Sequence, residues 1–171
     1  MEDTKQTSFD GVKKFNGLKK LEKIILNRND LKYLHGIEGF DSMKHLSVQF
    51  CEINDPFVIY QISKFKELES LNIKNNPVGE RLGNGHVRMR AVAEITKLKI
   101  INGAMLRKYD RKDCEIYYMR ETFREYFVLK NVPDYDYDFE DFMKFCDEGH
   151  PNIKHLIKKY GNPYEVEGIL L

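Results

Sequence analysis

Cysteines and histidines are the residues of this chain whose chemistry could support catalysis or metal binding. Cys51, Cys114 and Cys146 lie far apart and form no C-x-x-C pair, so we expect three reduced thiols that are buried or half-buried. His150 and His155 are five residues apart, which is a poor spacing for two ligands on one helical face. These residues therefore predict neither a nucleophile nor a metal site.

A glycine-rich stretch invites comparison with a phosphate-binding loop. Gly79, Gly83 and Gly85 lie in it, but neither G-x-G-x-x-G nor G-K-[ST] spacing is present, so we expect a surface loop. No Ser/His/Asp set and no paired acidic residues at catalytic spacing emerge elsewhere. We therefore expect no enzyme activity, no cofactor and no metal, and a function in binding.

One apolar pattern, L-x-x-L-x-x-L-x-L-x-x-N-x-L, recurs along the first hundred residues. It starts at Leu18, again at Phe40 22 residues later, and at Phe65 after a further 25 residues; a fourth copy starts at Ile95 and breaks off. A period of about 20 to 29 residues with L-x-L before Asn or Cys is typical of leucine-rich repeats. We predict an α/β fold, a leucine-rich repeat solenoid of the short-repeat intracellular type with a helical carboxy-terminal cap. The repeated positions are Leu18, Leu21, Ile24, Leu26, Asn29 and Leu31; Phe40, Met43, Leu46, Val48, Cys51 and Ile53; Phe65, Leu68, Leu71, Ile73, Asn76 and Val78; and Ile95, Leu98 and Ile101.

Each L-x-L segment predicts one short parallel strand whose alternate residues face opposite sides. Asn29 and Asn76 are expected to turn their amides inward and bind backbone groups at the bend after the strand. Cys51 takes that position in the second repeat, where it offers weaker hydrogen bonding. The inward-facing strand residues are expected to be Ile24, Leu26, Leu46, Val48, Leu71 and Ile73.

The connections between strands carry their own apolar spacing. Apolar residues every third position from Leu31 to Phe40 favour a 3₁₀-like return. Pro56 suits a first helical turn, and a second helix is expected after residue 85. The expected buried faces are Phe57, Ile59, Ile62 and Phe65 in the first helix, and Val87, Met89, Val92 and Ile95 in the second.

Three segments divide the chain. Residues 1–17 form an amino-terminal cap or a partial repeat cut from a longer protein, and we favour the fragment because Glu2 and Thr4 stand where strand leucines belong. Residues 18–110 hold the repeats. Residues 111–171 form a helical cap and a linker toward a missing domain.

The carboxy-terminal segment predicts three helices. The first, on which Ile116, Met119, Phe123 and Phe127 form one stripe, is expected to cover the open end of the solenoid; a groove for a partner helix is the alternative. An acidic, aromatic stretch at 131–141 follows, either a connector that starts a helix near Asp138 or a recognition peptide. Two further apolar sets mark helices, Phe139, Phe142, Met143 and Cys146, then Ile153, Leu156, Ile157 and Tyr160 before Gly161.

The charge balance limits the class of partner. The chain has 28 basic and 27 acidic residues, so net charge favours neither nucleic acid nor a membrane. The absence of a long apolar run and of a signal peptide predicts a soluble, cytoplasmic protein.

A series of short motifs resembles one family, and their order and spacing carry the resemblance across residues 65 to 165. In the leucine-rich region of tubulin-specific chaperone E, also named tubulin-folding cofactor E, an N-P pair ends the last repeat, an A-E-x-x-Y-like helix follows, and an H-P … K-Y-G segment precedes a ubiquitin-like domain. This chain resembles the chaperone E-like sibling of that family equally well. The matching residues here are Asn76-Pro77, Arg88, Arg90, Leu98, Asn102, Glu115, Tyr118, Phe123, His150-Pro151, Lys159-Tyr160-Gly161 and Pro163.

The resemblance implies a non-catalytic tubulin-binding module, with α-tubulin and other tubulin-folding cofactors as partners. It implies capture of α-tubulin, assembly or dissociation of the tubulin heterodimer, and a cytoskeleton-associated location. A generic intracellular adaptor of the same repeat subclass, such as a phosphatase regulator, a dynein component or a spliceosomal protein, is the alternative.

A leucine-rich solenoid binds through its concave strand face, where outward residues of successive strands form one surface. The outward residues are Lys23, Ile25, Asn27, His45, Ser47, Gln49, Ser70, Asn72, Lys74, Ile100 and Asn102. Because few residues dominate most interfaces, we select six. The predicted partner-binding residues are Lys23, Ile25, His45, Gln49, Asn72 and Lys74, with Lys23, Lys74 and Arg28 facing the acidic surface of tubulin.

Overall fold

The computed structural model describes residues 20–34, 36, 40–133, 137–163 and 165. Two compact units divide the chain, with the boundary between Arg107 and Lys108. We term them the strand unit and the helical unit, and describe each by itself. The predicted amino-terminal segment 1–17 and Leu18 lie outside the described residues.

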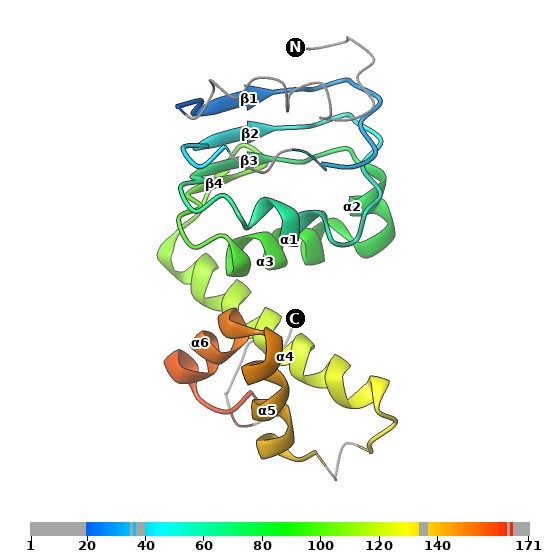
Figure 1. Ribbon diagram of the computed structural model, residues 1–171, viewed down its shortest axis with the longest axis vertical. Coiled ribbons are helices and arrows are strands. Elements are labelled where there is room, and N and C mark those ends of the chain that lie inside the picture. The colour runs from blue at the N-terminus through cyan, green and yellow to red at the C-terminus, as the bar shows by residue number, and fades with distance from the viewer. Residues whose placement is uncertain (1–19, 35, 37–39, 134–136, 164, 166–171) are drawn as a thin grey trace. The chain divides into compact units, whose positions relative to one another are not determined.

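A five-stranded sheet organises the strand unit, and its strands are stacked in chain order (Figure 1). The first four strands run parallel, and the fifth pairs with the fourth in the antiparallel direction. The predicted strands are confirmed, including the start of the fourth copy, while the fifth strand, after a turn at Gly103, was not predicted. The strands are β1 (Lys23–Ile25), β2 (His45–Ser47), β3 (Ser70–Asn72), β4 (Ile100–Ile101) and β5 (Ala104–Met105).

Buried aliphatic side chains form rows across neighbouring strands and pack these short strands against the core. The buried strand residues that lie opposite one another are all aliphatic: the register pairs Ile24 with Leu46, Leu46 with Leu71, and Leu71 with Ile101. Each buried side chain of this size contributes about 1.5–3 kcal/mol to folding. All the predicted inward residues are buried, which confirms the alternation: Ile24, Leu26, Leu46, Val48, Leu71 and Ile73.

Buried side-chain amides bind the backbone at the bends after β1 and β3, as predicted. The Asn29 side chain donates to the carbonyls of Leu26 at 2.9 Å and Asn27 at 3.1 Å. Asn76 donates to the carbonyl of Val48 at 2.8 Å and of Ile73 at 3.0 Å. These bonds satisfy carbonyls that the short strands leave without a ladder partner.

Cys51 occupies the equivalent position with a weaker donor. Its thiol lies 3.3 Å from the Leu26 carbonyl oxygen and 3.7 Å from that of Gln49. Burial raises the pKa of the Cys51 thiol, so the neutral form is favoured there. All three cysteines are free and buried.

Three helices lie in the connections after the second and third strands (Figure 1). The first, α1 (Val58–Ile62), confirms the predicted helix, with Ile59 and Ile62 buried. Phe57 was predicted on its buried face, and this is wrong: Phe57 is 62% exposed. Asp55 accepts a hydrogen bond from the Phe57 amide, which fixes a turn before the helix and leaves Val58 on the buried face instead.

The predicted surface loop over residues 79–85 is also wrong. Residues Pro77–Leu82 form α2, because Pro77 starts a helix without losing a hydrogen bond. Gly83, with φ of +85°, ends α2 and directly precedes α3 (Asn84–Glu94). In the second predicted helix Val87, Val92 and Ile95 are buried, and Met89 is half-buried. The stretch is therefore two helices joined by one glycine.

The return between β1 and β2 is described only in part. Leu31, Leu34 and Phe40 are buried, in agreement with the apolar spacing. Ile37 lies outside the described residues, so the 3₁₀-like return stays a prediction.

The helical unit contains α4 (Lys108–Leu129), α5 (Phe139–Gly149) and α6 (Pro151–Tyr160). Asp138 caps α5 by accepting from the amides of Glu140 and Asp141, which confirms the predicted start. Phe123 packs edge-to-face on Phe142, with ring centroids 4.9 Å apart. The predicted stripe of α4 is buried in full: Ile116, Met119, Phe123 and Phe127.

One buried carboxylate joins the first and last of these helices. Glu115 of α4 accepts hydrogen bonds from Lys159 Nζ and from the Tyr160 hydroxyl, both at 2.6 Å. Arg111 lies one turn before it, with N···O of 3.6 Å. The hydrogen bond to Glu115 raises the pKa of Lys159, which holds the ammonium in its charged form.

Across the residues that the structure describes, no helix combines the length and apolar character needed to cross a lipid bilayer. The expectation that α4 covers the end of the repeats concerns the placement of one unit on the other and stays a prediction.

Candidate partner-binding face

The six predicted binding residues lie along one side of the sheet, on three neighbouring strands or directly after them. Lys23 of β1 is opposite His45 of β2 in the register, and both side chains are exposed. The register places Ile25, Ser47 and Asn72 side by side on β1, β2 and β3. Ile25 and Asn72, on the two outer strands of these three, are half-buried. The structure thus groups Lys23 with His45 at the start of the strands.

Gln49 and Lys74 lie at the other end of the strands. Gln49 follows His45 by four residues, about 13 Å along an extended chain. The Asn72 amide donates to Gln49 Oε1 at 3.2 Å, and the Lys74 backbone amide donates to Asn72 Oδ1 at 3.4 Å. Lys23 and Lys74 therefore mark opposite ends of the face and not one basic cluster.

A ladder of side-chain amides crosses the centre of this face. Asn27 Oδ1 accepts from the Ser47 hydroxyl at 2.7 Å and from the Gln49 amide at 3.0 Å. Asn102 Oδ1 accepts from the Ile73 amide at 2.9 Å, which extends the ladder past β3. Fixed in this way, the side chains lose little rotamer freedom when a partner covers them.

Asn27 differs from its predicted role as an outward residue. It is only 8% exposed, because its amide turns into the ladder toward Ser47 and Gln49. An amide oxygen that meets two donors from the next strand is more favourable there than in water. Asn27 shapes the face and does not present itself to a partner.

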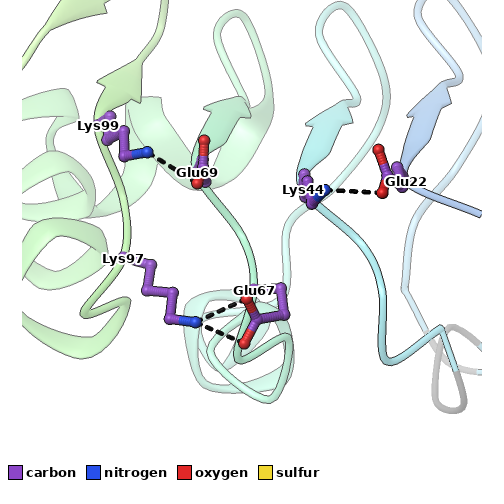
Figure 2. A network of polar contacts seen from close by, with 6 residues as sticks. All are labelled: Glu22, Lys44, Glu67, Glu69, Lys97 and Lys99. Atoms are coloured by element: carbon purple, nitrogen blue, oxygen red, sulfur yellow. Dashed lines mark hydrogen bonds and ion pairs between the residues drawn. The ribbon is translucent and has the colours of Figure 1, made fainter.

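Paired charges occupy the positions just before the strands (Figure 2). Glu22 receives a hydrogen bond from Lys44 at 2.7 Å, and Glu69 receives one from Lys99 at 2.8 Å. A further pair, Lys97 with Glu67 at 2.6 Å, lies two residues earlier in the chain. The row that leads into the four parallel strands alternates in charge: Glu22, Lys44, Glu69 and Lys99.

In two of these pairs one member has a pKa that is shifted toward its charged form, Lys44 in the first and Glu69 in the second. The hydrogen bond to Glu22 raises the pKa of Lys44. The hydrogen bond from Lys99 lowers the pKa of Glu69, and the charges of Lys44 and His45 lower it further. Within the described residues Lys23 and Lys74 belong to no ion pair, so their charges remain available to a partner.

Within the described ranges, no three His, Cys, Asp or Glu side chains gather where they could hold a metal ion. The face offers amide groups, two lysines and half-buried aliphatic side chains, which suits recognition of a polypeptide.

Sequence reasoning missed two features of the site. The ladder could have been suspected from the polar types at Asn27, Gln49 and Asn72, but its hydrogen bonds depend on side-chain orientation. The second is Phe50, which follows the strand row and is 49% exposed. The repeat pattern assigns no role to its position.

Two curated proteins are similar to this chain over most of its length. Tubulin-folding cofactor E of Arabidopsis thaliana is 27% identical over 172 residues, which cover 94% of this chain. Tubulin-specific chaperone E of Xenopus laevis is 30% identical over 159 residues, which cover 88% of this chain. These matches confirm the resemblance predicted from the sequence. The chain spans 30% of the length of each of these relatives.

Other comparisons add little. No protein-family model matches the chain. A solved structure of Chaetomium Mex67:Mtr2 subunits aligns with 60% of this chain and 68% of its own at 19% identity and a TM-score of 0.43. That likeness is too distant to carry an argument.

Proposed function

We propose that this chain is a non-catalytic, partner-binding module of a tubulin-folding chaperone and that it captures α-tubulin through its strand face. The similarity to two tubulin chaperones over most of the chain carries the proposal. Assembly or dissociation of the heterodimer with other folding cofactors belongs to the same proposal, as does a cytoplasmic, cytoskeleton-associated location.

The architecture proposed for this module is a leucine-rich repeat solenoid. Parallel strands stacked in chain order, each with the same buried pattern and an inward Asn or Cys after it, support this assignment. In our proposal residues 18–110 hold the repeats, 1–17 a cap or partial repeat, and 111–171 a helical cap and linker.

The chemistry of the face supports a protein partner with an acidic surface. Lys23 and Lys74 supply positive charge at the two ends, and Ile25 supplies apolar area near the middle. The charges before the strands are paired among themselves, so these pairs add no net charge. Steering of an acidic partner therefore depends on the lysines of the face.

Capture of purified tubulin by the immobilised 171-residue chain tests this proposal. We expect the chain to retain tubulin at low salt and the variant Lys23→Glu/Lys74→Glu to retain several-fold less. Both side chains are exposed, so the double variant is expected to fold normally.

The matched control is Lys32→Glu/Lys64→Glu, which changes net charge equally at exposed positions outside the strand face. Its capture is expected to equal that of the original chain. Equal capture by all three proteins would contradict a role of the strand face in binding. If none of the three captures tubulin, the proposed function itself is wrong.

A further inference from the structure

A row of residues with left-handed backbone lies directly after the strands. Arg28, Phe50 and Asn75 take equivalent places after β1, β2 and β3, with φ of 57°, 55° and 55°. The Arg28 amide donates to the Gln49 carbonyl at 3.0 Å, and the Phe50 amide donates to the Lys74 carbonyl at 3.1 Å. The stacking of the strands therefore imposes this backbone on whichever residue stands in the row.

Of the three residue types in this row, asparagine adopts the left-handed backbone conformation most readily, as it does at Asn75. A bulky side chain with positive φ is a rare conformation that costs free energy, and such outliers gather at functional sites. Phe50 is also 49% exposed, so it gains little from burial. For the stability of the fold alone, an asparagine at position 50 would therefore be more favourable than the phenylalanine that is present.

A cation covers the exposed ring. The guanidinium carbon of Arg28 lies 5.5 Å from the centroid of the Phe50 ring, at a distance that gives cation–π attraction. The pair joins neighbouring repeats and orders two side chains that would otherwise move freely. Aromatic and arginine side chains held in place are the types most enriched in the energetic centres of interfaces.

The residues around the Arg28–Phe50 pair carry a basic group and side-chain amides. Lys74 is exposed beside Phe50, and Gln49 precedes it with its Oε1 engaged by Asn72. Within the described part of the chain neither Arg28 nor Lys74 forms an ion pair. The exposed acids Asp30 and Glu52 come two residues after Arg28 and Phe50 in the chain, past the buried Asn29 and Cys51. An anionic partner is therefore complementary to this edge.

We infer that Arg28 and Phe50, with Lys74, form an anchoring site for an acidic polypeptide segment that carries a large apolar or aromatic side chain. The apolar side chain packs on the Phe50 ring, and carboxylates on either side meet Arg28 and Lys74. The inference rests on the proposed function, because it names the part of the partner that the face would hold.

The test uses a random copolymer of glutamate and tyrosine as the probe, with poly-glutamate and poly-lysine for comparison, in binding titrations with the 171-residue chain. We expect the copolymer to bind more tightly than poly-glutamate, and poly-lysine not to bind. Phe50→Asn is expected to weaken copolymer binding about tenfold. Arg28→Asn is expected to weaken it and to reduce its dependence on salt.

These substitutions separate binding from folding. Asparagine already occupies the row at position 75, so Phe50→Asn is expected to keep or raise the melting temperature. Phe57→Asn is the matched control, because it removes another exposed ring elsewhere in the strand unit, 62% exposed against 49% for Phe50. Its affinity for the copolymer is expected to be unchanged.

Unchanged affinity in Phe50→Asn, an equal loss in Phe57→Asn, or a fall in melting temperature that matches the loss of binding would overturn the inference. If the chain captures tubulin and Phe50→Asn captures it equally well, the anchoring site is wrong while the proposed function stands. If no tubulin is captured but copolymer binding depends on Phe50, the proposed function is wrong and the site stands.

Discussion

The inward position after each strand is filled by three side chains that differ in hydrogen-bonding capacity. Asn76 donates to the Val48 and Ile73 carbonyls and accepts from the Ile53 amide at 3.2 Å. Asn29 donates to the Leu26 and Asn27 carbonyls, and Cys51 contributes a thiol at longer distance. The three positions are alike in the repeat pattern and unlike in what they stabilise.

Removal of the Asn76 side chain is expected to destabilise the chain more than removal of the Cys51 side chain. Asn76→Ala leaves a buried carbonyl of Val48 and a buried amide of Ile53 without partners, for a loss of about 2–4 kcal/mol. Cys51→Ala should cost about 1 kcal/mol. Urea denaturation followed by circular dichroism measures the series, and equal losses at Asn76 and Cys51 would contradict the assignment.

Cys146 gives the helical unit a dependence on alkaline pH. Burial raises the pKa of its thiol to about 11, from 9.0 in the unfolded chain. The folded state therefore keeps a proton that the unfolded state loses. The contribution to stability is complete below pH 9 and is lost as the pH rises toward 11.

This linkage predicts that the free energy of unfolding falls more steeply between pH 8 and 10.5 in the original chain than in Cys146→Ala. The expected difference between the two slopes accumulates to about 1–2 kcal/mol. Because other groups titrate in the same range in both proteins, the comparison isolates the thiol. Parallel pH curves would show that the thiol ionises alike in both states.

At the scale of elements, the paired charges before the strands tie neighbouring repeats together at the surface. Glu69 stands between Lys44 and Lys99, and its backbone links to both through hydrogen bonds. Glu69→Lys would place three positive charges in a row. Glu67→Lys is the matched control, because the one ion pair it disrupts is that with Lys97, outside the row of Glu22, Lys44, Glu69 and Lys99.

We expect Glu69→Lys to lower the melting temperature more than Glu67→Lys in low salt. In about 1 M salt, where the screening length falls to about 3 Å, the difference should disappear. Thermal denaturation at the two salt concentrations measures the effect. A difference that persists in high salt would indicate lost packing and not charge repulsion.

The strands and the three carboxy-terminal helices could be predicted because their apolar spacing is regular. The repeat places Leu46 and Leu71 on adjacent strands, and the stripe that contains Met119 and Phe123 marks α4. The errors lie where side chains of one turn decide the start of a helix. Asp55 withdraws Phe57 from α1, and Pro77 starts a helix in a stretch whose glycines suggested a loop.

The proposed binding face could be predicted as a set of positions but not as a surface. Alternation along the strands is enough to select Lys23 and His45, whose side chains are exposed. It also selects Asn27, which is buried because the next strand supplies its hydrogen-bond donors. Phe50 was missed because its importance lies in a backbone angle, and a repeat pattern carries no information on φ.

At the scale of the whole molecule, the motif residues of the helical unit that carry the family resemblance have a structural explanation. Glu115, Lys159 and Tyr160 are far apart in sequence and meet in one hydrogen-bonded cluster between α4 and α6. Gly161 follows with φ of +96° and ends α6. These residues therefore identify the fold of the helical unit, whereas the residues proposed to bind a partner lie in the strand unit.

This separation predicts that the cluster can be weakened without loss of partner binding. Tyr160→Phe removes one of the donors to the buried Glu115 carboxylate and should destabilise the helical unit by about 1–3 kcal/mol. Tubulin capture at a temperature where the variant is still folded is expected to equal that of the original chain. Lys158→Ala, at an exposed position of the same helix, is the control for stability. A loss of capture in Tyr160→Phe without unfolding would place part of the binding surface on the helical unit, and the strand face would then not act alone.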